Sequence, residues 1–175
     1  MLVDELIPGL LTLGDVQKVL QNLLREGISI RDLLSIFEIL ADHATTAKDT
    51  DVLTEYVRQG LRRAISGKFF EGGEENQVVT VDPKIEQEIM SSIKQTEQGA
   101  FISLDPERTR AIMESTKEQI ARLEEMGKPP IVMCSPIVRM YFKKLSEDYF
   151  DDLIVISYNE VEPDINLKAS GMVAA

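Results

Sequence analysis

Two short apolar runs that flank an amphipathic helical pattern constrain the fold of this chain more than any other feature. The runs occupy residues 131–134 and 153–157, and the helical pattern lies between them. Strands joined through a helix are expected to run parallel, with a right-handed crossover. Continuous apolar runs are typical of strands covered on both faces of a sheet. We therefore predict a βαβ unit in this part of the chain.

Three dipeptides mark helix starts in the second half of the chain: Asp82-Pro83, Asp105-Pro106 and Ser135-Pro136. In each, a residue that can cap a helix precedes a proline, whose missing N–H would be unpaired in the first turn anyway. The core faces expected behind these starts are Ile85, Ile89 and Ile93; Ile112, Thr116, Ile120 and Leu123; and Val138, Tyr141, Phe142, Leu145 and Tyr149. The β-branched run Val78–Val81 is expected to join the same sheet, and Phe101–Leu104 is compatible with a short strand or a loop.

The first half of the chain has helical periodicity and predicts three helices. Their expected core faces are Val16, Val19, Leu20, Leu23 and Leu24; Leu33, Ile36, Phe37 and Leu40; and Leu53, Tyr56, Val57, Leu61 and Ala64. Gly27 and Gly67 are expected to end the first and third helices, because glycine readily adopts the left-handed conformation found at helix ends. Ser29, three residues before Asp32, predicts a capping box at the second helix. Gly60 lies inside the third helix, where it indicates a close helix contact.

The polar, glycine-rich segment Glu71–Asn76 separates the two halves, and the composition changes across it. Such a segment is typical of a linker or a tight surface loop. We predict a helical subdomain at residues 2–75 and an α/β subdomain at residues 76–175. The expected fold class is α+β overall, an all-α helical subdomain followed by a small α/β subdomain with a mostly parallel sheet of three or four strands.

The net charge of −11 is unevenly distributed, because residues 71–175 carry −9 of it. A field of this sign repels phosphate backbones and argues against nucleic acid as the main ligand, although it can attract basic partners. A single cysteine permits no internal disulfide and fits a reducing compartment. The sequence has no signal-peptide pattern and no apolar run of the roughly 20 residues needed to cross a bilayer. We therefore expect a soluble chain.

Residues with catalytic or metal-binding potential are few. His43 is the only histidine and has no second ligand beside it. Cys134 precedes a helix N-terminus, which can stabilise a thiolate. The arginine that closes a phosphatase-type phosphate cradle would have to lie six positions after such a cysteine, but here it comes one residue early, at Arg139. We therefore predict no enzymatic activity, no metal site and no cofactor. Cys134 is interpreted as a buried core residue, with nucleophilic catalysis as the alternative.

Two helical patterns, at residues 16–26 and 29–40, are joined by a glycine turn. This arrangement also occurs in helix–turn–helix modules that read DNA. The second helix, however, would present the acidic residues Asp32 and Glu38 outward. A nucleic-acid-binding module is therefore retained only as the alternative function.

Basic residues gather instead on the third helical pattern. Arg58 and Arg62 are four residues apart and share a helix face, and Arg63 follows directly. We expect this face to be exposed. Arg58, Arg62 and Arg63 are our candidates for a contact with another subunit or a partner.

Several motifs spread along the chain resemble one family. They are Val3–Pro8, Val16–Glu26, Ile28–Asp32, Pro130–Pro136 with Arg139 after it, and Ile156–Glu160. Together they resemble the cytosolic part of the FlhA family, the export-gate proteins of flagellar type III export, and its virulence-secretion counterparts.

The resemblance implies a cytosolic region of four subdomains, of which this chain matches the last two. It implies a full-length protein in the bacterial inner membrane, with this region in the cytoplasm and attached to the membrane only through an N-terminal part outside this chain. The implied partners are export chaperone–substrate complexes, other export-apparatus proteins and further copies in a ring of nine, without nucleic acid. The family's main chaperone-docking cleft lies between the first two subdomains, so no residue here is assigned to it.

Overall fold

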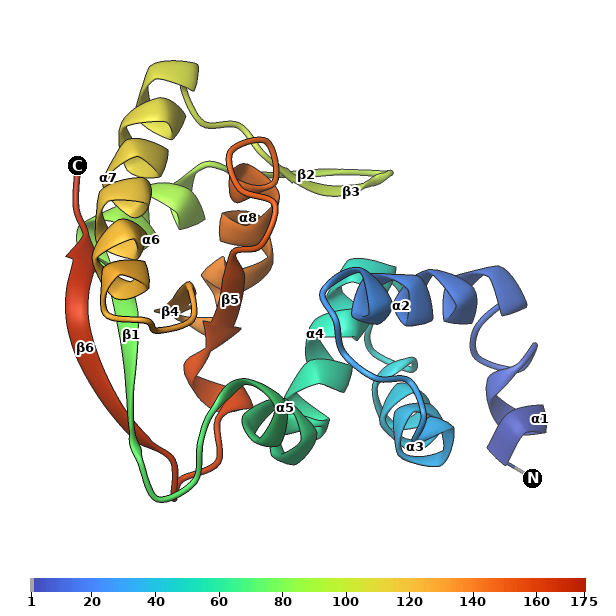
Figure 1. The fold of residues 1–175 in the computed structure, drawn as a ribbon. Coiled ribbons are helices and arrows are strands. Elements are labelled where there is room, and N and C mark those ends of the chain that lie inside the picture. Colours follow the sequence, from blue (N-terminus) through green and yellow to red (C-terminus); the bar gives the residue numbers. More distant parts are fainter. Residues whose placement is uncertain (1) are drawn as a thin grey trace. The chain divides into compact units, whose positions relative to one another are not determined.

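The computed structural model describes residues 2–175 and divides them into two compact units. The helical unit comprises the residues up to Phe69 together with Asn159–Glu162, and the sheet unit comprises Phe70–Tyr158 and Pro163–Ala175. Helices lead the chain and a parallel sheet follows (Figure 1), which confirms the predicted α+β fold class. Among the described residues, none of the helices combines the length and the apolar character that a bilayer-spanning helix requires.

Five helices build the helical unit within the described part of the chain. They are α1 (Leu2–Leu6), α2 (Leu13–Arg25), α3 (Leu33–His43), α4 (Thr50–Gly60) and α5 (Arg62–Phe69). The last two residues of the 3-10 turn η1 (Tyr158–Glu160) also belong to this unit. Helix α4 packs against both α2 and α3. Residues that are fully buried in this unit include Leu6, Val19, Leu23, Ile36, Leu40, Leu53 and Val57.

Helix α2 begins and ends with local hydrogen bonds that its sequence supplies. Thr12 and Asp15 form a capping box, in which each side chain accepts the other residue's backbone N–H. Gly27 follows the helix with a φ of 76°, and the N–H of Ile28 donates to the carbonyl of Leu23. This is a Schellman end, which requires a left-handed residue after the helix. The predicted stop at Gly27 is confirmed.

Helix α3 differs from its predicted start. Its N-cap is Asp32, whose carboxylate accepts the N–H of Ser35, whereas the hydroxyl of Ser29 accepts the N–H of Arg31 in the preceding turn. The hydroxyl of Ser35 also donates to Asp32 and is the main reason that the pKa of this carboxyl is lowered. The capping box predicted at Ser29 is therefore wrong, because a closer aspartate performs the capping.

The third predicted helix is two helices in the structure. It breaks at Leu61, between α4 and α5, so Gly67 lies inside α5 and the prediction that it ends the helix is wrong. A Cβ added at Gly60 would overlap the side chain of Ile39 on α3. The predicted close helix contact at Gly60 is confirmed, since only glycine leaves room for Ile39 there.

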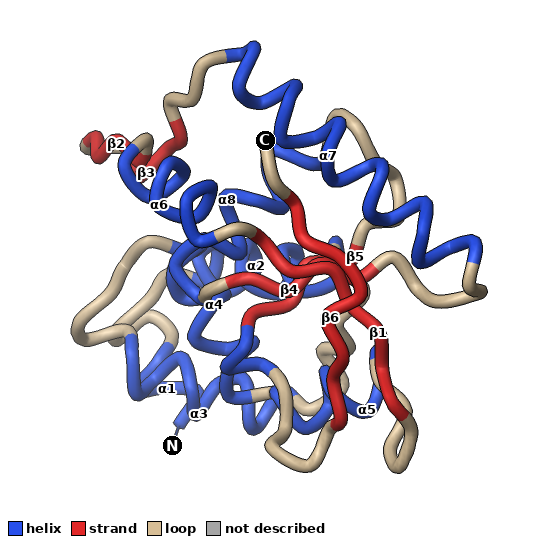
Figure 2. Tube along the Cα trace, turned by 90° about the vertical axis from the view of Figure 1, so that its left-hand side faces the viewer, coloured by secondary structure: helices blue, strands red, loops and turns tan. Residues whose placement is uncertain are grey.

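The sheet unit contains a four-stranded parallel sheet in the order β5-β4-β1-β6 and a separate antiparallel pair, β2-β3. Its elements are β1 (Glu75–Val81), α6 (Pro83–Ser91), β2 (Ile93–Thr96), β3 (Gly99–Ile102), α7 (Pro106–Glu125), β4 (Ile131–Cys134), α8 (Pro136–Ser146), β5 (Ile154–Ser157) and β6 (Asn166–Val173). Figure 2 shows β1 and β6 side by side. Helix α7 packs on β1 and β6, and α8 packs on β4 and β5.

The predicted βαβ unit is confirmed as β4, α8 and β5. The two strands are parallel, with Ile131 aligned to Ile154, and all four residues of β4 are buried. Asp82 and Asp105 cap α6 and α7 with their side chains, as predicted. Ser135 precedes α8 but makes no side-chain capping bond.

Two features of the sheet unit depart from the sequence prediction, and a third settles a choice that the sequence left open. Ile93 does not continue α6, which ends at Ser91, but begins β2. Phe101 lies in β3, so the open choice between strand and loop is settled as a strand that ends at Ile102. Strand β6 was not predicted, because an edge strand of mostly exposed or half-buried residues lacks the continuous apolar run that marks β4.

Candidate partner-binding surfaces

Arg58 does not lie on an exposed face. Its side chain is 2% exposed, and its Nε and Nη2 atoms donate to the two carboxylate oxygens of Glu160 at 2.7 and 3.1 Å. Glu160 is completely buried, and the carboxylate of Glu26 lies 3.7 Å from Nη1 of Arg58. The expectation of exposure is wrong for Arg58, because its partner is 102 residues away in sequence. Helical periodicity cannot reveal such a partner.

The segment Asn159–Glu162 makes further contacts inside the helical unit. The N–H of Glu162 donates to the hydroxyl of Ser66 at 2.9 Å, and Val161 is buried. Together with Glu160, these contacts explain why four residues from late in the chain belong to the helical unit.

Arg62 and Arg63 are exposed, unlike Arg58. The Arg62 side chain is 50% exposed, and its Nε lies 3.6 Å from the carboxylate of Glu162. An exposed pair at this distance contributes little to stability. The charges of Arg62 and Arg63 therefore remain accessible, and a contact through them remains a prediction.

Cys134 and Arg139 do not form a phosphate cradle. Cys134 is fully buried at the end of β4 and belongs to the core of the sheet unit. Arg139 is 1% exposed, and its Nη1 donates to the carbonyl of Val155 on β5 at 3.0 Å. The N–H of Ser135, which would have to face a bound phosphate, donates instead to the carboxylate of Glu86 at 2.6 Å. These positions agree with the interpretation of Cys134 as a core residue.

The Cys134 thiol is expected to resist iodoacetamide at neutral pH while the protein is folded, because the reagent cannot reach a fully buried sulfur. Mass spectrometry should show the unmodified chain under native conditions and one adduct after unfolding in guanidinium chloride. Rapid single labelling of the folded chain would contradict the core assignment.

His43 lies at the end of α3 and stacks on the ring of Tyr56, with centroids 4.0 Å apart and planes 7° from parallel. The side chain thus has a packing role within the helical unit. Across residues 2–175, the structure contains no group of three or more His, Cys, Asp or Glu side chains arranged to hold a metal ion.

Charged and phenolic groups in the sheet unit have shifted pKa values. Arg108 on α7 donates from Nε and Nη2 to both carboxylate oxygens of Glu88 on α6, each at 2.8 Å, and these bonds lower the pKa of Glu88. Burial is the main cause of the raised pKa of Tyr158, and the nearby carboxylate of Glu86 raises it further. Both shifts therefore have local packing and pairing as their causes.

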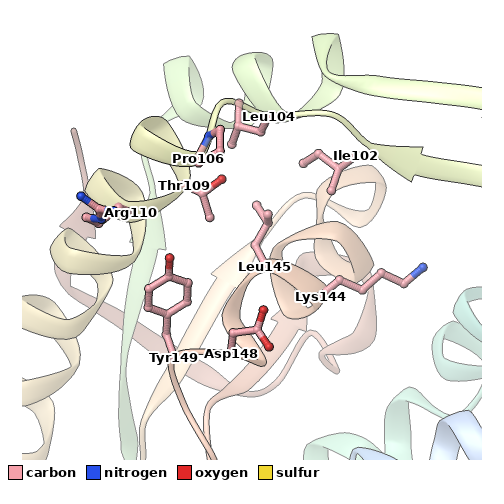
Figure 3. A pocket seen from close by; sticks show the side chains of 9 residues that line it. All are labelled: Ile102, Leu104, Pro106, Thr109, Arg110, Lys144, Leu145, Asp148 and Tyr149. Carbon is pink, nitrogen blue, oxygen red and sulfur yellow. The ribbon is translucent and has the colours of Figure 1, made fainter.

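A pocket of about 330 Å³ lies in the sheet unit between the start of α7 and the end of α8 (Figure 3). Its lining combines apolar and charged side chains: Ile102, Leu104, Pro106, Thr109, Arg110, Lys144, Leu145, Asp148 and Tyr149. The sequence pattern assigned Leu145 and Tyr149 to the core face of a helix. In the structure Tyr149 lies beyond α8 and is 49% exposed, so it is available to a partner.

Comparison with known proteins defines the class of protein to which this chain belongs. The chain is 43% identical over 172 residues to the flagellar biosynthesis protein FlhA of Bacillus subtilis. It is 32% identical over 171 residues to the low calcium response locus protein D of Yersinia pestis. Both alignments cover 98% of this chain but only 25% and 24% of those relatives, so the chain spans about a quarter of their length.

Solved structures give the same result. The Chlamydia pneumoniae CdsV protein matches with a TM-score of 0.88 and 39% identity, over 99% of this chain and 48% of that one. The nonameric EPEC SctV-C matches with a TM-score of 0.85 and 36% identity, over 98% of this chain and 51% of that one. Fold and relatives thus place the chain with the flagellar FlhA proteins and with cytosolic domains of the type III secretion system. The chain belongs to the FHIPEP family, whose model matches residues 1–166, which confirms the resemblance drawn from its motifs.

Proposed function

We propose that this chain is the distal part of the cytosolic region of a type III export-gate component. It acts as a scaffold and as a docking platform for export chaperone–substrate complexes and other export-apparatus proteins. The full-length protein resides in the bacterial inner membrane, with this region in the cytoplasm. The work is done by binding, without catalysis and without a cofactor.

One observation carries this proposal: the similarity to flagellar and virulence export proteins extends over 98% of the chain. Two solved relatives, SctV-C and the EscV cytosolic domain, are nonameric, which supports self-association into a ring. A structure of CdsV in complex with CdsO supports binding to a further protein of the apparatus. The helix–turn–helix alternative gains no such support, since Leu34 and Glu38 face outward on α3 instead of basic side chains.

Within the ring, Arg62 and Arg63 form the contact that we propose between subunits. They are exposed, they belong to the helical unit, and they carry positive charge in a chain whose net charge is −11. An acidic surface on the neighbouring copy would complement them.

The test uses the cytosolic region of the Bacillus subtilis protein as a hybrid. In it, residues 2–175 replace the segment to which they align, which is about a quarter of the full-length protein. Electron microscopy should show ring-shaped particles. Arg62→Glu combined with Arg63→Glu should reduce the fraction of rings, whereas the matched reversal of two exposed cations elsewhere in the helical unit, Lys18→Glu with Arg31→Glu, should not. A folded hybrid without rings would contradict self-association through this region, and equal losses in both double variants would remove Arg62 and Arg63 from the contact.

A further inference from the structure

The pocket between α7 and α8 has an apolar floor. Leu145 lies at its centre in Figure 3, and Ile102 lines it from the end of β3 and Leu104 from the loop before α7. These three side chains are only partly buried, so an apolar group placed on them would remove further surface from water. The volume of about 330 Å³ is at the lower end of the range of about 300–1,000 Å³ for ligand pockets. It suits one or two side chains of a peptide.

The charged side chains that line the pocket differ in their orientation relative to the apolar floor. In Figure 3, the carboxylate of Asp148 lies between Leu145 and Tyr149, while the charged ends of Arg110 and Lys144 point outward on opposite sides. The Lys144 ammonium lies 5.9 Å from the centroid of the Tyr141 ring, which does not line the pocket. Of the three charged side chains that line the pocket, the carboxylate of Asp148 is thus the one that does not point outward in Figure 3.

Asp148 also belongs to an acidic turn, residues 147–152, that follows α8. Four of its six residues are exposed acids, Glu147, Asp148, Asp151 and Asp152. Together with the overall charge of −11, this turn attracts cations to one side of the pocket. Charge complementarity thus favours a basic occupant over an acidic one.

We propose that this pocket binds a linear segment of a partner protein in which an aliphatic side chain is followed by basic residues. The aliphatic side chain packs on Leu145 and the neighbouring apolar wall, and a basic side chain pairs with Asp148. The exposed ring and hydroxyl of Tyr149 cover the edge of the bound segment. The inference rests on the proposed docking function and specifies the chemistry of one partner segment.

The test is an NMR titration of the ¹⁵N-labelled full chain with a synthetic peptide that has a Leu-Lys-Arg core between Ser and Gly flanks. Amide signals of Thr109, Leu145 and Asp148 should shift in a saturable manner, and added salt should weaken the binding. Peptides with a Ser-Lys-Arg core or a Leu-Glu-Glu core should bind at least threefold more weakly. Equal or tighter binding of the Leu-Glu-Glu peptide, or shifts that bypass these amides, would overturn the proposal.

Two matched variants test whether the charge of Asp148 itself contributes to peptide binding. Asp148→Asn should weaken binding about two- to fivefold, the range expected for one exposed ion pair. Asp152→Asn removes the same charge from the same turn at a position that does not line the pocket, so its effect should be smaller. Equal weakening by both variants would overturn the assignment of Asp148. If the hybrid forms rings but no peptide shifts the pocket amides, the proposal that this pocket binds a peptide is overturned. The proposed function is then unaffected.

Discussion

Replacing Arg58 by alanine is expected to lower the free energy of unfolding of the helical unit by about 3–5 kcal/mol. The substitution leaves the carboxylate of Glu160, which is 0% exposed, without its bidentate partner. Loss of the main partner of a buried charge is among the most destabilising changes that a single substitution can produce. Urea denaturation followed by far-UV circular dichroism measures the loss.

Two further variants separate the ion pair from other effects of the substitution. Arg62→Ala removes an exposed cation on the neighbouring helix and should cost less than about 1 kcal/mol. Arg58→Met combined with Glu160→Leu removes both charges and should regain most of the stability, since apolar replacements of buried pairs are often neutral. If Arg58→Ala costs no more than Arg62→Ala, the buried pair does not hold Asn159–Glu162 in the helical unit.

Replacing Phe142 by alanine is expected to lower the free energy of unfolding of the sheet unit by about 3–5 kcal/mol. Phe142 is fully buried on α8 and belongs to the core formed with Val132 and Val155 of β4 and β5. Removal of the ring takes away its apolar burial and leaves a cavity that the strands fill only partly. The loss should appear as a lower midpoint in urea denaturation.

A matched control lies on the same helix. Ile137 is 62% exposed, so Ile137→Ala should change the free energy of unfolding by no more than about 0.5 kcal/mol. Similar losses for Ile137→Ala and Phe142→Ala would contradict the assignment of the buried face of α8.

Much of the fold followed from local signals in the sequence. The apolar runs of β4 and β5 and the prolines at positions 83, 106 and 136 act within a few residues, so they identify their elements without knowledge of the rest of the chain. The same holds for Gly27, whose positive φ ends α2. Strand β6 was missed because its stability comes from pairing with β1, far earlier in the sequence, and not from a pattern of its own.

The candidate surfaces could be predicted less well from the sequence than the fold. The spacing of Arg58 and Arg62 predicts a shared helix face. Only the structure shows that Arg58 is buried against Glu160, whereas Arg62 is exposed. The pocket is lined by residues from two segments far apart in the sequence, Ile102–Arg110 and Lys144–Tyr149. An acidic turn next to apolar residues was the only signal, and solvated acids are common at protein surfaces.

The most direct test of the proposed export function is complementation of motility. A Bacillus subtilis strain that lacks its own FlhA would produce the hybrid protein with residues 2–175 in place of the matching quarter, and its swimming in soft agar would be measured. The proposal predicts that the hybrid restores swimming, and that an otherwise identical hybrid carrying Arg58→Ala restores less. A hybrid that accumulates to normal levels in the membrane but leaves the cells non-motile would contradict the assignment of this chain to flagellar export.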